Sequence, residues 1–274
     1  MRNRKKISLL LYVSVILFVY SLRVLIIPRL FYLTYSEEMT GRETLLNALM
    51  QYAVLLLGSF ALGIKEREDI SREVFLGTKK WIYYIILGVM LYYSFQFLTN
   101  GLIMVITEHD KVVAFSDSNI RSIIFIIIIQ VGWAALAEEL WYRNSVFRLF
   151  PFENFIVGAI FTSLLFCLVH QSIEQKIHSF CLSLLLCYIL KKEKNIVPCI
   201  IVHATFNLLG IFYSFVMHEK VGFLLRRSGA LAYYNARSGG IVLVCMAIIL
   251  LAIVYVIIWK NWKHSSKKLN TYEV

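Results

Sequence analysis

Charged residues are scarce in this sequence. Only 16% of the 274 residues are charged, whereas 59% are hydrophobic. We find no soluble domain, internal repeat or low-complexity linker between the apolar runs. Several of these runs approach or exceed the roughly 20 residues needed to cross a hydrocarbon core. The sequence therefore predicts a multi-pass membrane protein that lies in a lipid bilayer.

Several catalytic and metal-binding motifs are also missing. The five cysteines lie inside apolar segments and form no CxxC or zinc-ribbon pattern, so we interpret them as free thiols. The sequence contains no HExxH, the pattern that places two zinc ligands on one helix. It also lacks an intramembrane GxSxG serine elbow and a pair of intramembrane aspartates. Serine and aspartyl intramembrane proteases are therefore poor interpretations.

Basic residues gather between the apolar runs, and the net charge is +11. An excess of Lys and Arg in short cytoplasmic segments is typical of membrane proteins, so we interpret these residues as topology signals and predict no nucleic-acid partner. The basic segments at 1–6, 65–80, 143–148 and 191–194 and the C-terminal tail fall on one side of the membrane. This arrangement predicts a plasma-membrane protein with both termini in the cytoplasm. The basic loop at 220–240 is the one segment that violates the rule.

The predicted fold class is all-α, a polytopic bundle of about eight transmembrane helices. We interpret the basic start and the long apolar run after it as a retained first span, because no small-residue cleavage site follows. Arg23 interrupts this span and either pairs with another group or snorkels to the interface. The expected spans cover residues 7–27, 44–64, 81–106, 122–150, 154–170, 177–190, 196–217 and 240–259.

Two adjacent carboxylates and an arginine follow the apolar run at 123–136. A charge near the bilayer centre costs about 2.5–3.5 kcal/mol, so such groups must pair, face the protein interior or contact water. In a helix, Glu139 and Arg143 are four residues apart and are close enough for an ion pair. Glu138 points about 100° away from that face. We therefore predict one structural and one chemical carboxylate.

Two further pairs of side chains recur at helical spacing inside apolar runs. Phe166 and His170 are four residues apart, as are His203 and Asn207, so each pair shares one helix face. With Glu138, these residues would bring a base, two imidazoles and an amide donor to one point in the bundle. Taken singly, each histidine is explained equally well by interhelical packing.

The depth of these residues constrains the fourth helix. If this helix ended at Arg143, Glu138 would lie near the membrane surface and far from His170. If it continues to Phe150, before Pro151, Glu138 lies about 18 Å from its end at 1.5 Å per residue, which matches the level of His170. We therefore predict a long or broken fourth helix and a fifth helix that extends past His170.

Taken together, the three motifs resemble those of the CPBP family of membrane proteins. In chain order they are EExxxR at 138–143, FxxxH at 166–170 and HxxxN at 203–207. This family comprises CAAX prenyl endopeptidases and bacteriocin-processing or immunity proteins of the Abi type. The resemblance covers residues 122–209. It implies a catalytic core, and the predicted domains are 1–121 with three spans, 122–217 with this core, and 218–274 with a loop, the last span and a basic tail.

The resemblance also implies a role for each motif residue. Glu138 would activate water as the general base, and His170 would help to hold that water. His203 and Asn207 would donate hydrogen bonds to the oxyanion of the tetrahedral intermediate. Structural support would come from Glu139, Arg143 and Phe166. The implied activity is that of an intramembrane endopeptidase of the glutamic type, acting on a peptide precursor or a membrane-associated protein.

Alternatives to a metal-free endopeptidase remain open, both for the cofactor and for the function. Glu138, His170 and His203 would also suit zinc, and the family has been described both as metalloproteases and as glutamic proteases; we favour a metal-free mechanism. An immunity or regulatory protein without proteolytic activity would retain the same fold. A transporter or proton relay is weakened by the lack of a second, matched set of interrupted helices. The oligomeric state is not predicted.

Overall fold

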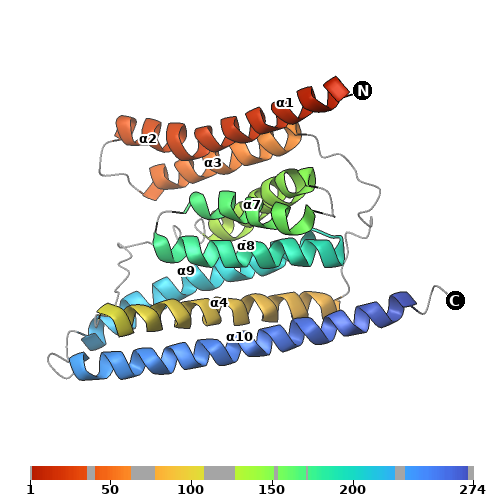
Figure 1. The fold of residues 1–274 in the computed structure, drawn as a ribbon. Helices are drawn as coiled ribbons and strands as arrows, with labels where there is room; N and C mark the ends of the chain where they lie inside the picture. The colour runs from red at the N-terminus through yellow and green to blue at the C-terminus, as the bar shows by residue number, and fades with distance from the viewer. Residues whose placement is uncertain are drawn as a thin grey trace. The chain divides into compact units, whose positions relative to one another are not determined.

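The computed structural model describes helices throughout (Figure 1). It covers residues 2–35, 41–62, 78–107, 127–150, 154–170, 172–225 and 232–270. None of these ranges contains a strand, in agreement with the predicted all-α class.

Four helices within the described ranges are long and apolar enough to cross a membrane. They are Leu11–Leu30, Lys80–Leu102, Ile173–Glu193 and Gly239–Ile258. Shorter apolar helices are found at Leu45–Ala61, Phe155–Leu168 and Val197–Phe212. These helices support a membrane protein, while the total of eight spans and the cytoplasmic orientation of the termini stay predictions.

The chain divides into two compact units. The first unit contains Met1–Trp81 and Asp117–Leu208, and the second contains Ile82–Ser116 and Leu209–Val274. Every motif residue singled out from the sequence lies in the first unit. The three sequential domains predicted above stay a prediction.

The N-terminal helix runs without interruption to Tyr35 but changes its hydrogen-bonding pattern on the way. Its parts are α1 (Arg2–Ser21), the π-helical turn η1 (Leu22–Ile26) and α2 (Ile27–Tyr35). Pro28 explains the π turn, because proline lacks an N–H and its ring clashes with the carbonyl four residues earlier, at Val24. The helix therefore extends beyond the predicted end of the first span at Ile27, and the π turn contains Arg23.

The next helix, α3 (Gly41–Ala61), packs closely on α1 at Gly58. A Cβ atom at this position would lie 2.6 Å from Cζ3 of Trp141 and 2.7 Å from Cγ2 of Val19. Both distances are shorter than van der Waals contact. Only glycine therefore allows the two helices to approach Trp141 in this way.

Replacing Gly58 by Ala is expected to destabilise the first unit by about 1–3 kcal/mol, because the added methyl group overpacks a rigid aromatic contact. Gly132→Ala is the matched control, since a Cβ at this exposed helical glycine meets nothing within 4 Å. We expect the control to be neutral or slightly stabilising. Thermal unfolding in detergent measures both changes, and equal unfolding temperatures for the two variants would contradict the packing.

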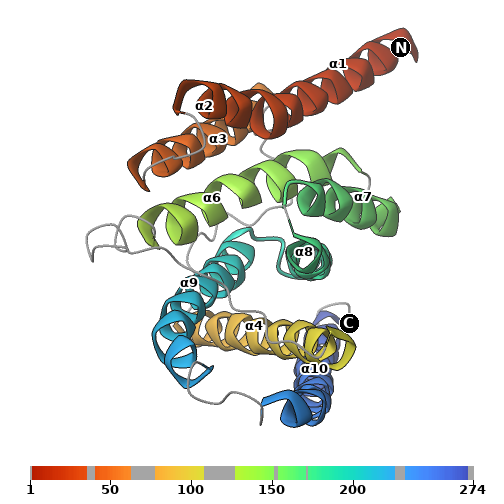
Figure 2. The same cartoon turned by 90° about the vertical axis from the view of Figure 1, so that its left-hand side faces the viewer.

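A single helical run forms the centre of the first unit. Its parts are η2 (Ile127–Trp133), α6 (Ala134–Glu139), η3 (Leu140–Val146) and the 3₁₀ turn η4 (Phe147–Leu149). The run ends at Phe150, whose backbone is extended with φ −92° and ψ 131°. Figure 2 shows the run between α3 on one side and α7 on the other. The prediction of a long or broken fourth helix is confirmed; its expected start at 122–126 lies outside the described residues.

The fifth helix, α7 (Phe155–Leu168), packs along α8 (Ile173–Glu193). It ends at Leu168, so the prediction that it extends past His170 is wrong. The chain instead begins α8 within a few residues, because the Ser172 hydroxyl caps the new helix by accepting from the Gln175 N–H at 3.2 Å. His170 therefore lies just after the end of α7, and Nδ1 of its ring is directed at the Phe166 carbonyl of that helix.

The turn after α8 sets the start of α9 (Val197–Leu225). Lys194 adopts a left-handed conformation with φ 51° and ends α8. The side chain of Asn195 then accepts from the Val197 N–H at 2.9 Å, and Pro198 stands in the first turn of α9 as predicted. This local arrangement places His203 two turns into the helix.

The second unit contains α4 (Thr78–Thr107) from Ile82 onward, which the predicted third span matches, and α10 (Ala232–Asn270), side by side in Figures 1 and 2. A Cβ at Gly101 would lie 2.7 Å from the Gly240 carbonyl oxygen, so this glycine permits the close helix contact. The predicted loop at 220–240 is wrong at both ends, because α9 continues to Leu225 and α10 begins at Ala232.

Candidate active site

Both carboxylates of the EExxxR motif are buried in the central helical run. Glu138 is 5% exposed, and Glu139 and Arg143 are completely buried. Nη1 of Arg143 lies 3.1 Å from Oε1 of Glu139, which confirms the predicted ion pair across one helical turn. The Arg143 guanidinium also lies over the Phe166 ring, 4.9 Å from its centroid. This half of the motif is closed to solvent and suits a structural role.

The imidazole of His203, on α9, lies between the two carboxylates. Its Nδ1 is 2.7 Å from Oε1 of Glu139, a hydrogen-bond distance, and its Nε2 is 3.6 Å from Oε2 of Glu138. Glu139 therefore orients the ring, as carboxylates orient catalytic and metal-bound histidines. Only Nε2 faces the second carboxylate.

Arg23 supplies the ion-pair partner of Glu138. Its Nη2 donates to Oε1 of Glu138, and its Nη1 donates to the Tyr142 hydroxyl at 3.3 Å. The guanidinium also lies over the Tyr52 ring at 5.7 Å. Of the two arrangements expected for Arg23, the structure shows pairing and not snorkelling. The negative charges of two carboxylates and the positive charges of two guanidiniums cancel in this buried cluster. Their attraction offsets the free energy of removing each charge from water.

His170 lies on the edge of the same cluster. Its Nδ1 is 3.0 Å from the Phe166 carbonyl oxygen, and its ring meets the Phe166 ring edge-on with centroids 5.1 Å apart. His170 also interacts electrostatically with Glu138. A hydrogen bond from Nδ1 to the carbonyl selects the tautomer in which Nε2 is an acceptor.

The Phe166 ring connects the three motifs. Besides the ring of His170 and the guanidinium of Arg143, it meets the His203 ring at 5.6 Å and the Tyr142 ring at 5.0 Å, both nearly perpendicular. This side chain is 1% exposed. The predicted supporting role of Phe166 therefore has a physical basis, since one rigid ring fixes both imidazoles.

Asn207 lies one turn after His203, and its side chain is already engaged. Its Nδ2 donates to the backbone carbonyl of Gln130 at 3.0 Å, while the Gln130 side chain accepts from the Tyr52 hydroxyl at 3.0 Å. The amide has a second hydrogen on Nδ2, which this contact does not use. Gln130 belongs to the π-helical segment η2, a type of distortion often found at functional sites.

Further neighbours that no sequence motif predicted complete the cluster. They are Tyr52, Gln130 and Tyr142, together with the pairing of Arg23 and Glu138. A signal for that pairing was available, since a lone arginine in the first apolar run needs an acidic partner at membrane depth. No spacing rule predicts the tyrosines, because they come from different helices.

Zinc held by Glu138, His170 and His203 is the alternative that the sequence leaves open. Across the described ranges, no group of three or more His, Cys, Asp or Glu side chains could hold a metal ion. Arg23 already places a cation on Glu138, and Nδ1 of His203 faces Glu139. A divalent cation on the same carboxylate would be repelled by that guanidinium. Metal-free catalysis stays a prediction, and we derive no step through a metal.

The comparison with protein families agrees with this geometry. Residues 120–209 match the family described as Rce1-like, type II CAAX prenyl endopeptidase Rce1-like. The chain carries an Rce1-like domain. The resemblance to the CPBP family is thereby confirmed, and the match indicates a protease. No curated protein and no solved structure matches the chain.

The Rce1-like domain contains all three motifs but not the whole cluster. Glu138, His170, His203 and Asn207 lie within residues 120–209, as does the Glu139–Arg143 pair. Arg23 and Tyr52 lie outside this range. The N-terminal helices therefore contribute side chains to the buried site of the Rce1-like domain.

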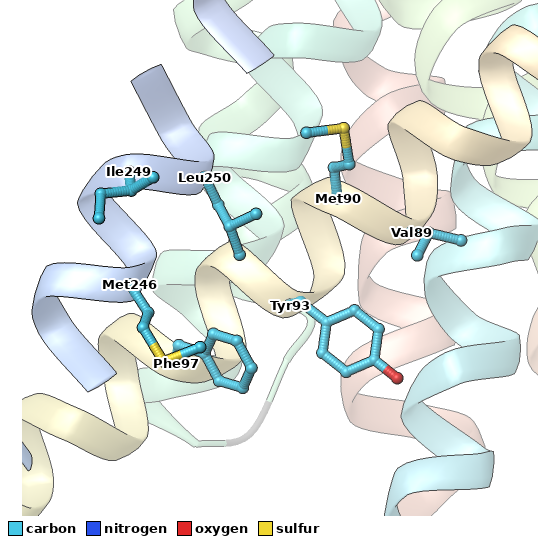
Figure 3. A pocket seen from close by; sticks show the side chains of 7 residues that line it. All are labelled: Val89, Met90, Tyr93, Phe97, Met246, Ile249 and Leu250. Carbon is cyan, nitrogen blue, oxygen red and sulfur yellow. The ribbon is translucent and has the colours of Figure 1, made fainter. Parts of the chain in front are cut away.

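The second unit contains a pocket of different character. It has a volume of about 520 Å³ and is lined by apolar side chains and one tyrosine of α4 and α10 (Figure 3). These residues are Val89, Met90, Tyr93, Phe97, Met246, Ile249 and Leu250. None of them is a carboxylate or an imidazole, so this pocket lacks the acid and base groups of the buried cluster.

Proposed function

We propose that the chain is an intramembrane endopeptidase that hydrolyses a peptide bond with a water molecule activated by Glu138. The main support is that the two oxygens of this carboxylate have different contacts. Oε1 is held by Arg23, whereas Oε2 faces the imidazole of His203 at 3.6 Å. A buried carboxylate with one oxygen anchored and the other directed toward an imidazole is suited to general-base catalysis.

In the first step, Glu138 takes a proton from water. The water donates one hydrogen to Oε2 of Glu138 and the other to Nε2 of His170, whose Nδ1 is engaged with the Phe166 carbonyl. A lone pair on the water oxygen then attacks the scissile carbonyl carbon. The proton moves to Oε2, and the carbonyl π electrons move to the oxygen, which becomes the oxyanion.

The oxyanion is stabilised from α9. In this step His203 donates from Nε2 to the oxyanion, while its Nδ1 donates to the Glu139 carboxylate. The free hydrogen on Nδ2 of Asn207, one helical turn away, is the second donor. Collapse of the intermediate breaks the C–N bond, and Glu138 returns its proton to the leaving amine. The products are one carboxylic acid and one amine, with no other reactant consumed.

Glu139 and Arg143 support this chemistry without taking part in it. Both are fully buried and paired, and Glu139 directs the His203 ring. Breaking a buried pair leaves an uncompensated charge, so the pair stabilises the central helix at the point where the site is built.

The proposed substrate is a peptide or membrane protein that reaches the site within the bilayer. The apolar helices and the match to a CAAX-type protease family support this class. A peptide precursor and a prenylated CAAX sequence are both substrates of this chemical type. They differ in whether a lipid is attached beside the scissile bond.

Purified protein in proteoliposomes is expected to cleave at least one of two internally quenched probes. One is a farnesylated CAAX peptide, and the other is the same peptide without the lipid. Cleavage is expected to continue in the presence of 1,10-phenanthroline, because no step uses a metal. Complete inhibition by the chelator with recovery on adding zinc would contradict the glutamate mechanism, and cleavage of neither probe would contradict the activity on these substrates.

A further inference from the structure

The two oxygens of Glu138 have different surroundings, and the first helix causes the difference. Nη2 of Arg23 donates to Oε1. Oε2 faces Nε2 of His203 instead. A carboxylate that is free to rotate would exchange these oxygens, whereas one held by a charge-assisted hydrogen bond keeps one orientation.

The position of Arg23 is itself tightly determined. The residue lies in the π turn that precedes Pro28, and it is 6% exposed. Its guanidinium is held by the Tyr142 hydroxyl and by the face of the Tyr52 ring, on two different helices. These contacts hold the planar guanidinium in place independently of its hydrogen bond to Glu138. Arg23 therefore acts as a fixed support for the carboxylate.

We propose that Arg23 is a positioning residue of the active site, which anchors Oε1 of Glu138 so that Oε2 is the oxygen that receives the proton from water. This inference rests on the proposed function. It extends the site beyond the matched residues 120–209 and assigns a role in the reaction to the first helix. Arg23 itself does not contact the reacting atoms.

A purely structural arginine would give a different result from a positioning arginine. Lysine retains the positive charge but lacks the planar fork that contacts a carboxylate and a tyrosine hydroxyl together. If Arg23 only neutralises a buried charge, Arg23→Lys keeps full activity. If it orients Glu138, Arg23→Lys folds normally but recovers only part of the turnover, since small misplacements of a catalytic group can reduce rates by about 10²-fold.

The test compares five proteins in proteoliposomes, with the quenched CAAX probe that the wild type cleaves. They are the wild type, Arg23→Lys, Arg23→Met, Glu138→Gln and the control Arg29→Met. Arg29 is exposed on the adjoining helix α2, so its replacement is expected to leave kcat unchanged. For Arg23→Met we expect kcat to fall about 10²-fold with KM unchanged, and for Arg23→Lys an intermediate kcat.

Thermal unfolding of these five proteins and of a double variant separates positioning from folding. We expect Arg23→Met to unfold at a lower temperature than the wild type, and the double variant Arg23→Met/Glu138→Gln to recover part of this loss, because neither charge is then left alone. Additive effects of the two substitutions would overturn the pairing without any activity measurement.

Each kinetic result also has a defined meaning. Wild-type kcat in Arg23→Met or in Arg23→Lys, with Glu138→Gln inactive, overturns the positioning role and leaves the proposed function intact. If Glu138→Gln cleaves the probe at the wild-type rate, both the positioning role of Arg23 and the proposed function are overturned. A fall in kcat that is confined to the Arg23 and Glu138 variants supports both.

Discussion

Glu138→Gln is expected to reduce kcat by about 10²–10⁴-fold, the range that a general base typically contributes. Glutamine has nearly the same size as glutamate, and its amide oxygen still accepts a hydrogen bond from Arg23. It has no carboxylate oxygen to take a proton from water. The protein is therefore expected to remain folded in the membrane and to bind substrate while losing turnover. The measurement is cleavage of the quenched peptide by proteins matched for amount in proteoliposomes.

Glu139→Gln is the matched control for this result. The two residues are adjacent and similarly buried, but Glu139 contacts His203 and Arg143, and the proposed mechanism gives it no proton to accept from water. Its replacement is expected to lower kcat less than that of Glu138 and to lower the unfolding temperature more. Retained activity in Glu138→Gln together with lost activity in a well-folded Glu139→Gln would show that the roles of the two carboxylates are reversed.

Arg143→Met is expected to cause a large loss of stability, about 3–5 kcal/mol. Arg143 is completely buried, and its removal leaves the Glu139 carboxylate in an apolar interior without its cationic partner. The double variant Arg143→Met/Glu139→Gln is expected to recover much of the loss, because both charges are then gone. Chemical or thermal unfolding in detergent gives the values.

The exposed ion pair of Lys80 and Glu193 provides the comparison for Arg143. Its atoms lie 3.3 Å apart, similar to the buried pair, but the Lys80 side chain is 61% exposed. Surface pairs contribute about 0–1 kcal/mol, so Lys80→Met is expected to have little effect. If Arg143→Met and Lys80→Met lowered stability by the same small amount, burial would not explain a large contribution of the Glu139–Arg143 pair to stability.

Local rules predicted much of the helical structure and part of the site. The i,i+4 rule gave the Glu139–Arg143 pair, and the depth argument gave a fourth helix that continues to the extended residue Phe150. The shared faces of Phe166 with His170 and of His203 with Asn207 followed from helical periodicity. These features depend on residues close together in the chain, whose geometry a helix fixes.

The parts that the sequence did not predict depend on contacts between distant residues. Arg23 and Glu138 are 115 positions apart, and the hydrogen bond from Asn207 to Gln130 spans 77 positions. Spacing rules do not specify which apolar helices become neighbours. The π turns were also missed, although Pro28 accounts for the first of them after the fact. The apolar run alone does not predict the end of α7 before His170, because the hydroxyl of Ser172 caps the next helix and so ends the run early.

Comparative peptidomics tests the central claim most directly. Cells that contain the wild-type chain are compared with cells that contain equal amounts of the Glu138→Gln chain, and new peptide termini are quantified by mass spectrometry. The account predicts cleavage products that appear with the wild type and are lost or strongly reduced with the variant, while the uncut precursor accumulates. Equal amounts of the same products in both cell populations would contradict a peptidase that depends on Glu138, and an undiminished biological effect of the variant would indicate a membrane protein that acts without proteolysis.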